Sequence, residues 1–147
     1  MNRAETQYAD YFSVSFRIGG DDLDPNIITS LLEIEPDQAH KKGDPKTLKT
    51  KKGEIHNYTP YNSGLWCYTS KLDKYSRIQD HIESVLELIT PKKEVLSQFR
   101  IKGYRMDFFC GHFFAGAPQP GIFIAGDVLK KLGDLGIDLD IDLYAYT

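Results

Sequence analysis

The stretch Tyr11-Phe-Ser-Val-Ser-Phe-Arg-Ile18 alternates strictly between apolar and polar side chains. Its apolar positions are Phe12, Val14, Phe16 and Ile18. A period of two predicts a strand with one buried and one exposed face. Strands that are covered on both faces read instead as continuous apolar runs. The stretch therefore predicts a sheet whose helices lie on one face only.

The same reasoning extends outward to the rest of the chain. Further strands are expected at 65–69, 103–114 and 137–146, where aromatic or alternating residues occur. Helices are expected from Asp24-Pro25 to Pro36, from Ser76 to Pro91, over Val95–Phe99, and from a cap at Asp127. The order is β-α-β, a helical connection, then β-α-β.

Two βαβ units most simply form a four-stranded, mainly antiparallel sheet with helices on one face, an elaborated ferredoxin-like α+β fold. In that order the first strand lies between the third and the last. With 147 residues the chain is one domain, 1–147. Residues 1–10 are expected to be a disordered or extended N-terminus, and residues 40–63 a lysine-rich loop insertion.

Composition narrows the class of protein. The formal net charge of −3 argues against a general nucleic-acid binder, which carries a basic excess. The chain has no run of apolar residues long enough to span a membrane. The first ten residues hold no apolar signal core, and Cys67 and Cys110 are too few for a disulfide framework. We therefore expect a cytoplasmic protein that does not bind membranes.

The one local cluster of metal-ligating residue types is Cys110-Gly-His112, whose side chains share a strand face. Cys110 falls on the expected core side, where a free cysteine behaves as a small hydrophobe, so a structural role is favoured over a metal site. The segment 115–121 lacks the Lys-Ser/Thr of a phosphate loop, and no GxSxG occurs. We predict no catalytic residue, metal or cofactor. An enzyme would need a cleft in which a histidine meets a carboxylate, the candidates being His56, His81 and His112.

The most informative residues are those that alternation directs away from the helices. They are expected to form one partner-binding surface of Tyr11, Ser13, Arg17, Arg105, Asp107, Asp138, Asp140, Asp142, Tyr144 and Tyr146. Aspartates at i, i+2 and i+4 repel one another and are poor strand formers. They are explained by a cationic partner, by charge that protects an edge strand, or by simple solvation of the face. Tyrosines beside charges favour recognition.

A second candidate is basic. Residues 41–52 hold six lysines and one aspartate, whereas residues 132–147 hold four aspartates and no basic residue. The lysines are Lys41, Lys42, Lys46, Lys49, Lys51 and Lys52. The loop is either merely solvated or an arm that binds phosphate or acidic groups. The near-neutral total charge therefore hides a dipolar protein.

Several runs have the order and spacing of a known family. They are Leu23-Asp24-Pro25, Leu32-Glu-Ile34-Glu-Pro36, Lys42-Gly43-Asp44, Gly64-Leu-Trp66 and Leu135-Gly-Ile-Asp-Leu-Asp-Ile-Asp-Leu-Tyr144. Over residues 11 to 146 the chain resembles the uncharacterised bacterial family catalogued as domain of unknown function 4279. The long lysine-rich segment 44–63 departs from it. The resemblance implies no activity, but small bacterial domains of this kind often look like immunity proteins that neutralise a toxin.

These expectations combine into one function and one alternative. The first is a non-enzymatic protein-binding domain, most concretely an immunity protein whose acidic face occludes a basic toxin such as a nuclease. The alternative is a small-molecule-binding regulatory module, whose pocket would be lined by Trp66, Tyr68, Tyr104 and the 115–121 loop.

Overall fold

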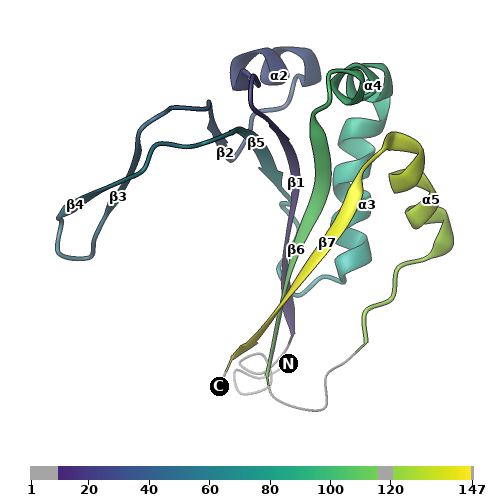
Figure 1. Ribbon diagram of the computed structural model, residues 1–147. Coiled ribbons are helices and arrows are strands. Elements are labelled where there is room, and N and C mark those ends of the chain that lie inside the picture. The colour runs from purple at the N-terminus through teal and green to yellow at the C-terminus, as the bar shows by residue number, and fades with distance from the viewer. Residues whose placement is uncertain (1–9, 116–120, 147) are drawn as a thin grey trace.

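The computed structural model describes residues 10–115 and 121–146 (Figure 1). Its elements follow in the order β1 (Tyr11–Gly20), α2 (Pro25–Leu32), β2 (Gln38–His40), β3 (Lys46–Lys49), β4 (Ile55–Tyr58), β5 (Gly64–Thr69), α3 (Ile78–Ile89), the 3-10 turn η1 (Thr90–Lys92), α4 (Lys93–Ile101), β6 (Arg105–Ala115), α5 (Gly126–Leu135) and β7 (Asp138–Tyr146). The expectation for 1–10 falls on residues that, apart from Asp10, lie outside this description.

The main sheet has five strands in the order β2-β5-β1-β6-β7, within the described residues. Every neighbouring pair is antiparallel except β6 and β7, which run parallel. The α+β class and the largely antiparallel pairing agree with the expectation. The four-stranded ferredoxin-like order does not: β1 lies between β5 and β6, and β6 rather than β1 lies beside the last strand.

The difference arises in the first half of the chain. β2 and β1 are both antiparallel to β5, so β1, α2 and β2 form a parallel unit into which β5 inserts. The strand at 65–69 is therefore not the end of the first βαβ unit. The three-residue β2 ends it, and so short a strand carries no periodic signal. The second half, β6-α5-β7, is a βαβ unit as expected.

The core lies between the sheet and its helices. Val14, Phe16 and Ile18 of β1 are at most 1% exposed, and Phe108 of β6 is fully buried. They pack with Ile82 of α3 and with apolar residues of α2, α4 and α5 in one cluster. Figure 1 shows α3, α4 and α5 on the same side of the sheet. The alternation of Tyr11–Ile18 is thus explained by helices on one face.

Two helix boundaries differ from the sequence prediction. Asp24 caps α2 by accepting the Asn26 amide at 3.0 Å, but the helix ends at Leu32, well before Pro36. Glu33 adopts a left-handed conformation there, with φ of 59°. Asp127 is not a cap, because Ala125 occupies that position and Asp127 lies in the first turn of α5. A carboxylate in the first turn still complements the helix dipole.

The segment 41–61, called the arm, forms a hairpin and leaves the body of the molecule. Its strands β3 and β4 pair only with each other and form a separate two-stranded sheet among the described residues. In Figure 1 the arm projects from the β2–β5 edge, on the side of the sheet away from α3, α4 and α5. No helix in the described part of the chain is long and apolar enough to cross a membrane.

Candidate functional site

The face of the sheet that the helices leave uncovered, called the open face, gathers most of the residues selected from the sequence. Strand register aligns them in rows. Arg17 stands opposite Asp107, which stands opposite Asp138. Ser13 aligns with Gly111 and Asp142 in a second row. The first strand thus joins the aspartates of the last strand through β6, not directly. The side chain of Tyr146 lies outside the described part of the structure.

An arginine network holds the centre of the open face. Arg17 donates to both carboxylate oxygens of Asp107, from Nε to Oδ1 at 2.8 Å and from Nη2 to Oδ2 at 2.6 Å. Its guanidinium lies 4.3 Å above the centre of the Phe109 ring. The bond to Asp107 raises the pKa of Arg17. Asp107 is therefore the nearest counter-charge of Arg17, and Asp140 is a more distant partner at 3.9 Å.

The remaining charges of the open face are mostly negative. Four carboxylates, of Asp107 and the β7 aspartates, face two guanidinium groups. Asp138 and Asp142 make no ion pair with any described residue, and neither does the exposed Arg105. An acidic strip along β7 is the result.

An aromatic row closes the far end of the open face. Tyr11 and Phe113 stack with ring centres 4.6 Å apart, and Phe113 stacks on Tyr144 at 4.8 Å. A Cβ at Gly111 would lie only 3.0 Å from the Phe113 ring, so glycine there lets that ring lean over β6. Partial desolvation and a hydrogen bond to Asp142 raise the pKa of Tyr144, whose hydroxyl donates at 3.2 Å. The acidic strip and the aromatic row are therefore continuous.

A cavity of about 440 Å³ lies where the arm leaves the sheet. Its walls come from the open face and from the base of the arm, and include Arg17, Arg105, Asp138, His40 and Tyr61. His40 and Tyr61 stack with ring centres 3.5 Å apart, and burial lowers the pKa of His40. Neither residue was selected from the sequence. His40 and Tyr61 are 21 positions apart in the sequence and come together only in the folded chain, so no local sequence pattern identifies them.

The lysines of the arm are distributed unevenly. Lys41 is held to the body by Asp24, with Nζ 3.4 Å from the carboxylate. Lys46 lies over the Tyr61 ring at 5.2 Å. The others, Lys42, Lys49, Lys51 and Lys52, are exposed and make no ion pair with a described residue. The outer part of the arm is therefore strongly basic.

The Cys110-Gly-His112 cluster is built into the core. Cys110 is fully buried, and burial raises the pKa of its thiol to about 12. His112 is 2% exposed, stacks on Phe12, and places Nε2 2.8 Å from the carboxylate of Asp10. No group of three or more His, Cys, Asp or Glu side chains gathers as for a metal ion in the described residues. His112 does contact a carboxylate, that of Asp10, but the imidazole of His112 is itself buried.

Of the other two histidines in the prediction, His81 is buried and His56 is exposed. His81 is 2% exposed and its Nδ1 lies 2.8 Å from the hydroxyl of Ser70. Burial lowers the pKa of His81. His56 lies on the exposed strand β4 of the arm. A base needs access to the proton that it removes, and neither buried histidine offers that access.

The aromatic residues expected to line a ligand pocket belong to the core or adjoin it: Trp66 is part of the buried cluster, and Tyr68 and Tyr104 pack against that cluster. Trp66 is fully buried and donates its indole N–H to the hydroxyl of Thr29 at 3.0 Å, so it belongs to the core. Tyr104 packs against Phe99, with ring centres 6.0 Å apart. Of the 115–121 loop, residues 116–120 lie outside the described part of the chain.

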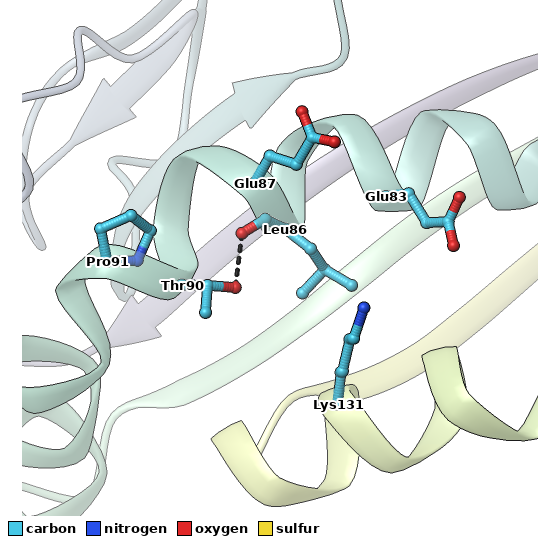
Figure 2. Close-up of a pocket in the computed structure, with 6 residues that line it drawn as sticks. All are labelled: Glu83, Leu86, Glu87, Thr90, Pro91 and Lys131. Carbon is cyan, nitrogen blue, oxygen red and sulfur yellow. Dashed lines mark hydrogen bonds between the residues drawn. The ribbon is translucent and has the colours of Figure 1, made fainter.

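A further cavity of about 550 Å³ lies between α3 and α5 (Figure 2). Glu83 and Glu87 border it from α3, and Lys131 points toward Leu86 from α5. The hydroxyl of Thr90 donates to the carbonyl of Leu86 at 2.6 Å. This cavity is a groove between two helices, on the side of the sheet opposite the predicted surface.

Comparison with protein families matches residues 8–146 to the family described as a domain of unknown function (DUF4279). No curated protein and no solved structure matches the chain. The matched residues span β1 to β7, and so include the open face and the arm. On this match the chain belongs to the DUF4279 family.

Proposed function

We propose that this chain is a non-enzymatic, cytosolic protein-binding domain, most concretely an immunity protein that occludes the basic cleft of a bacterial toxin. The observation that carries the proposal is the open face, where an acidic strip runs into a row of stacked aromatic rings. A basic cleft, such as that of a nuclease, is the complementary surface.

The charges support fast encounter with such a partner. Arg17 pairs most closely with Asp107 of β6, and Asp138 and Asp142 of the strip on β7 have no ion pair with a described residue. Complementary potentials raise association rates at low salt and disfavour acidic proteins as partners. The surface is also preorganised, because the strand that carries the strip is hydrogen-bonded to β6 along its length.

The aromatic row supports slow release. Tyrosine and phenylalanine supply large contact areas at a low cost in conformational entropy, and such residues dominate binding energies at interfaces. Tyr144 is 41% exposed, and Phe113 is partly buried beside it. The rings are already stacked before a partner arrives, so little order remains to be imposed on binding.

Edge protection explains only part of the pattern. β7 does lie at the edge of the sheet in the described residues, and charged side chains deter edge-to-edge pairing. That reasoning accounts for the aspartates of β7. It does not account for aromatic side chains that cross from β1 to β7 on the same face.

The proposal is tested with a candidate toxin chosen from the products of the genes that flank the gene for this chain. Coexpression should protect cells from that toxin, and the two purified proteins should form a complex. Replacing Asp138, Asp140 and Asp142 with lysine should abolish protection. The matched control replaces Glu83, Glu87 and Glu94 on the helices with lysine and should retain it. Protection that survives the reversal on β7, or a toxin that neither binds nor is neutralised, refutes the proposal.

A small-molecule-binding module is the second candidate, favoured by the cavity at the base of the arm. Arg105 and Asp138 both border that cavity, so it suits a ligand that carries both charges. A ligand that binds only the native protein raises its melting temperature. Thermal-shift screening with zwitterionic metabolites should then give a hit that Arg105→Ala removes. The absence of any such hit removes this candidate.

A further inference from the structure

The arm presents a surface that its own molecule leaves uncovered. Every residue of β3 and β4 is exposed. Three of them are large and apolar: Leu48 is 58% exposed, Ile55 69% and Tyr58 50%. An isolated two-stranded hairpin is at best marginally stable in water. Packing against a second surface would therefore stabilise the hairpin.

The charge of the arm indicates what kind of surface would be complementary to it. Its outer lysines make no ion pair with a described residue, and the strand pairing sets Lys46 opposite Tyr58 and Lys49 opposite Ile55. Basic and apolar side chains are thus interleaved on the hairpin. The surface that fits it carries carboxylates next to exposed aromatic rings.

The same chain carries such a surface on its open face. Asp138, Asp140 and Asp142 supply the carboxylates, and Tyr144 supplies an exposed ring. The arm does not cover its own acidic strip, because β2 and β7 lie at opposite edges of the sheet and the hairpin stands clear of β7 (Figure 1). The complementary face is accessible in a second copy.

We propose that two copies of this chain associate, with the arm of each laid along the open face of the other. A twofold axis makes this contact twice and closes the assembly. The nine residues of β7 span about 30 Å, which is long enough for a four-residue strand of the arm to lie along it. Lys49 and the neighbouring Lys51 and Lys52 meet the aspartates of β7, while Ile55, which lies opposite Lys49 on the same face of the hairpin, meets the aromatic row.

This association goes beyond the proposed function and does not rest on it. Because both use the open face, a toxin and a second copy would compete for the same aspartates. Association is therefore expected to fall when a partner that binds the open face is added.

Sedimentation velocity on the full chain tests the proposal. In about 0.05 M salt the mass should rise toward twice that of the monomer as protein concentration increases, and in about 0.5 M salt it should return to that of the monomer, because screening weakens exposed charge pairs. Lys49, Lys51 and Lys52 changed together to glutamate should give a monomer. Asp138, Asp140 and Asp142 changed together to lysine should also give one.

Mixing these two variants separates a broken contact from a broken fold. In the mixture each basic arm finds an acidic face and each acidic arm finds a basic face, so the mixed pair should associate again. The control changes Lys93, Lys102 and Lys131 to glutamate, which alters the net charge equally, and it should associate like the unmodified chain.

Three results overturn the proposal. The first is a chain that stays monomeric in low salt, even if its arm then binds nucleic acid or anionic vesicles. The second is an association that the arm and face variants leave unchanged. The third is a mixture of the two variants that remains monomeric.

Discussion

The acidic strip of β7 and the lysines of the arm are both rows of like charge, yet they stand on very different supports. β7 pairs with β6 along its length, and the residues of β6 that alternate with the open face are buried. β3 and β4 pair only with each other among the described residues, and all their residues are exposed. A row of charge over a core is held in place by the packing beneath it, whereas a row of charge on an isolated hairpin lacks that support.

The largest expected difference between the two regions is in stability. Phe108→Ala removes a fully buried ring beneath the open face and should lower the free energy of unfolding by about 3–5 kcal/mol. Leu48→Ala in the arm should change it by less than about 0.5 kcal/mol, since surface substitutions rarely do more. Urea denaturation followed by the fluorescence of Trp66 measures both. Similar losses in the two variants would show that the arm is part of the cooperative core.

The next largest effect is the loss of stability when a charged side chain is removed from each region. Asp107→Ala leaves the half-buried Arg17 without its two hydrogen bonds and should cost about 1–2 kcal/mol. Lys49→Ala in the arm should cost less than about 0.5 kcal/mol. A double-mutant cycle on Arg17 and Asp107 isolates their coupling. A coupling indistinguishable from zero would mean that the pair does not organise the open face.

Acidification should affect the body of the molecule, where His81 lies in α3, more than the arm, and this difference should be smaller than the preceding ones. Burial lowers the pKa of His81 in the folded protein, so the unfolded chain binds the proton more tightly. This contribution to stability is complete above the ordinary pKa of 6.5 and declines as the pH falls below it. His81→Gln should flatten the decline in the free energy of unfolding, measured by urea titrations across this range. His56→Gln, in the arm, is the control. An unchanged slope in the His81 variant would contradict the assignment.

The smallest expected effect is local to the end of the acidic strip. The carboxylate of Asp142 accepts the hydroxyl of Tyr144 and helps to raise the pKa of that phenol. Asp142→Asn should therefore lower the pKa of Tyr144, as measured from its ring carbon shifts by nuclear magnetic resonance. The same substitution should leave the shifts of Tyr58 in the arm unchanged. An unchanged pKa of Tyr144 would contradict an interaction between the acidic strip and the aromatic row.

Local patterns in the sequence account for most of the elements and for the exposed side of the sheet. Alternation over Tyr11–Ile18 and over 137–146 predicts which side chains face away from the helices, because side-chain direction in a strand follows from its period alone. The strand order is a different matter. It depends on β2, whose three residues carry no period, and on the insertion of β5 between β2 and β1.

Some residues of the candidate site could also be predicted from local patterns, and others could not. The acidic and aromatic residues of β1, β6 and β7 follow from alternation, although their neighbours across the sheet do not. His40 and Tyr61 border the cavity at the base of the arm only because β2 and the chain before β5 come together in space. Their contact depends on how distant segments pair in the folded chain, and no pattern among neighbouring residues predicts it.

In the proposed function the open face, rather than the arm, binds the partner protein. Calorimetric titration of the candidate toxin into the unmodified chain, the Asp138/Asp140/Asp142→Lys variant and the Lys49/Lys51/Lys52→Glu variant tests it most directly. The face variant should lose at least about tenfold in affinity, about 1.4 kcal/mol, while the arm variant binds at least as well as the unmodified chain. Undiminished binding by the face variant, with loss confined to the arm variant, would contradict the claim.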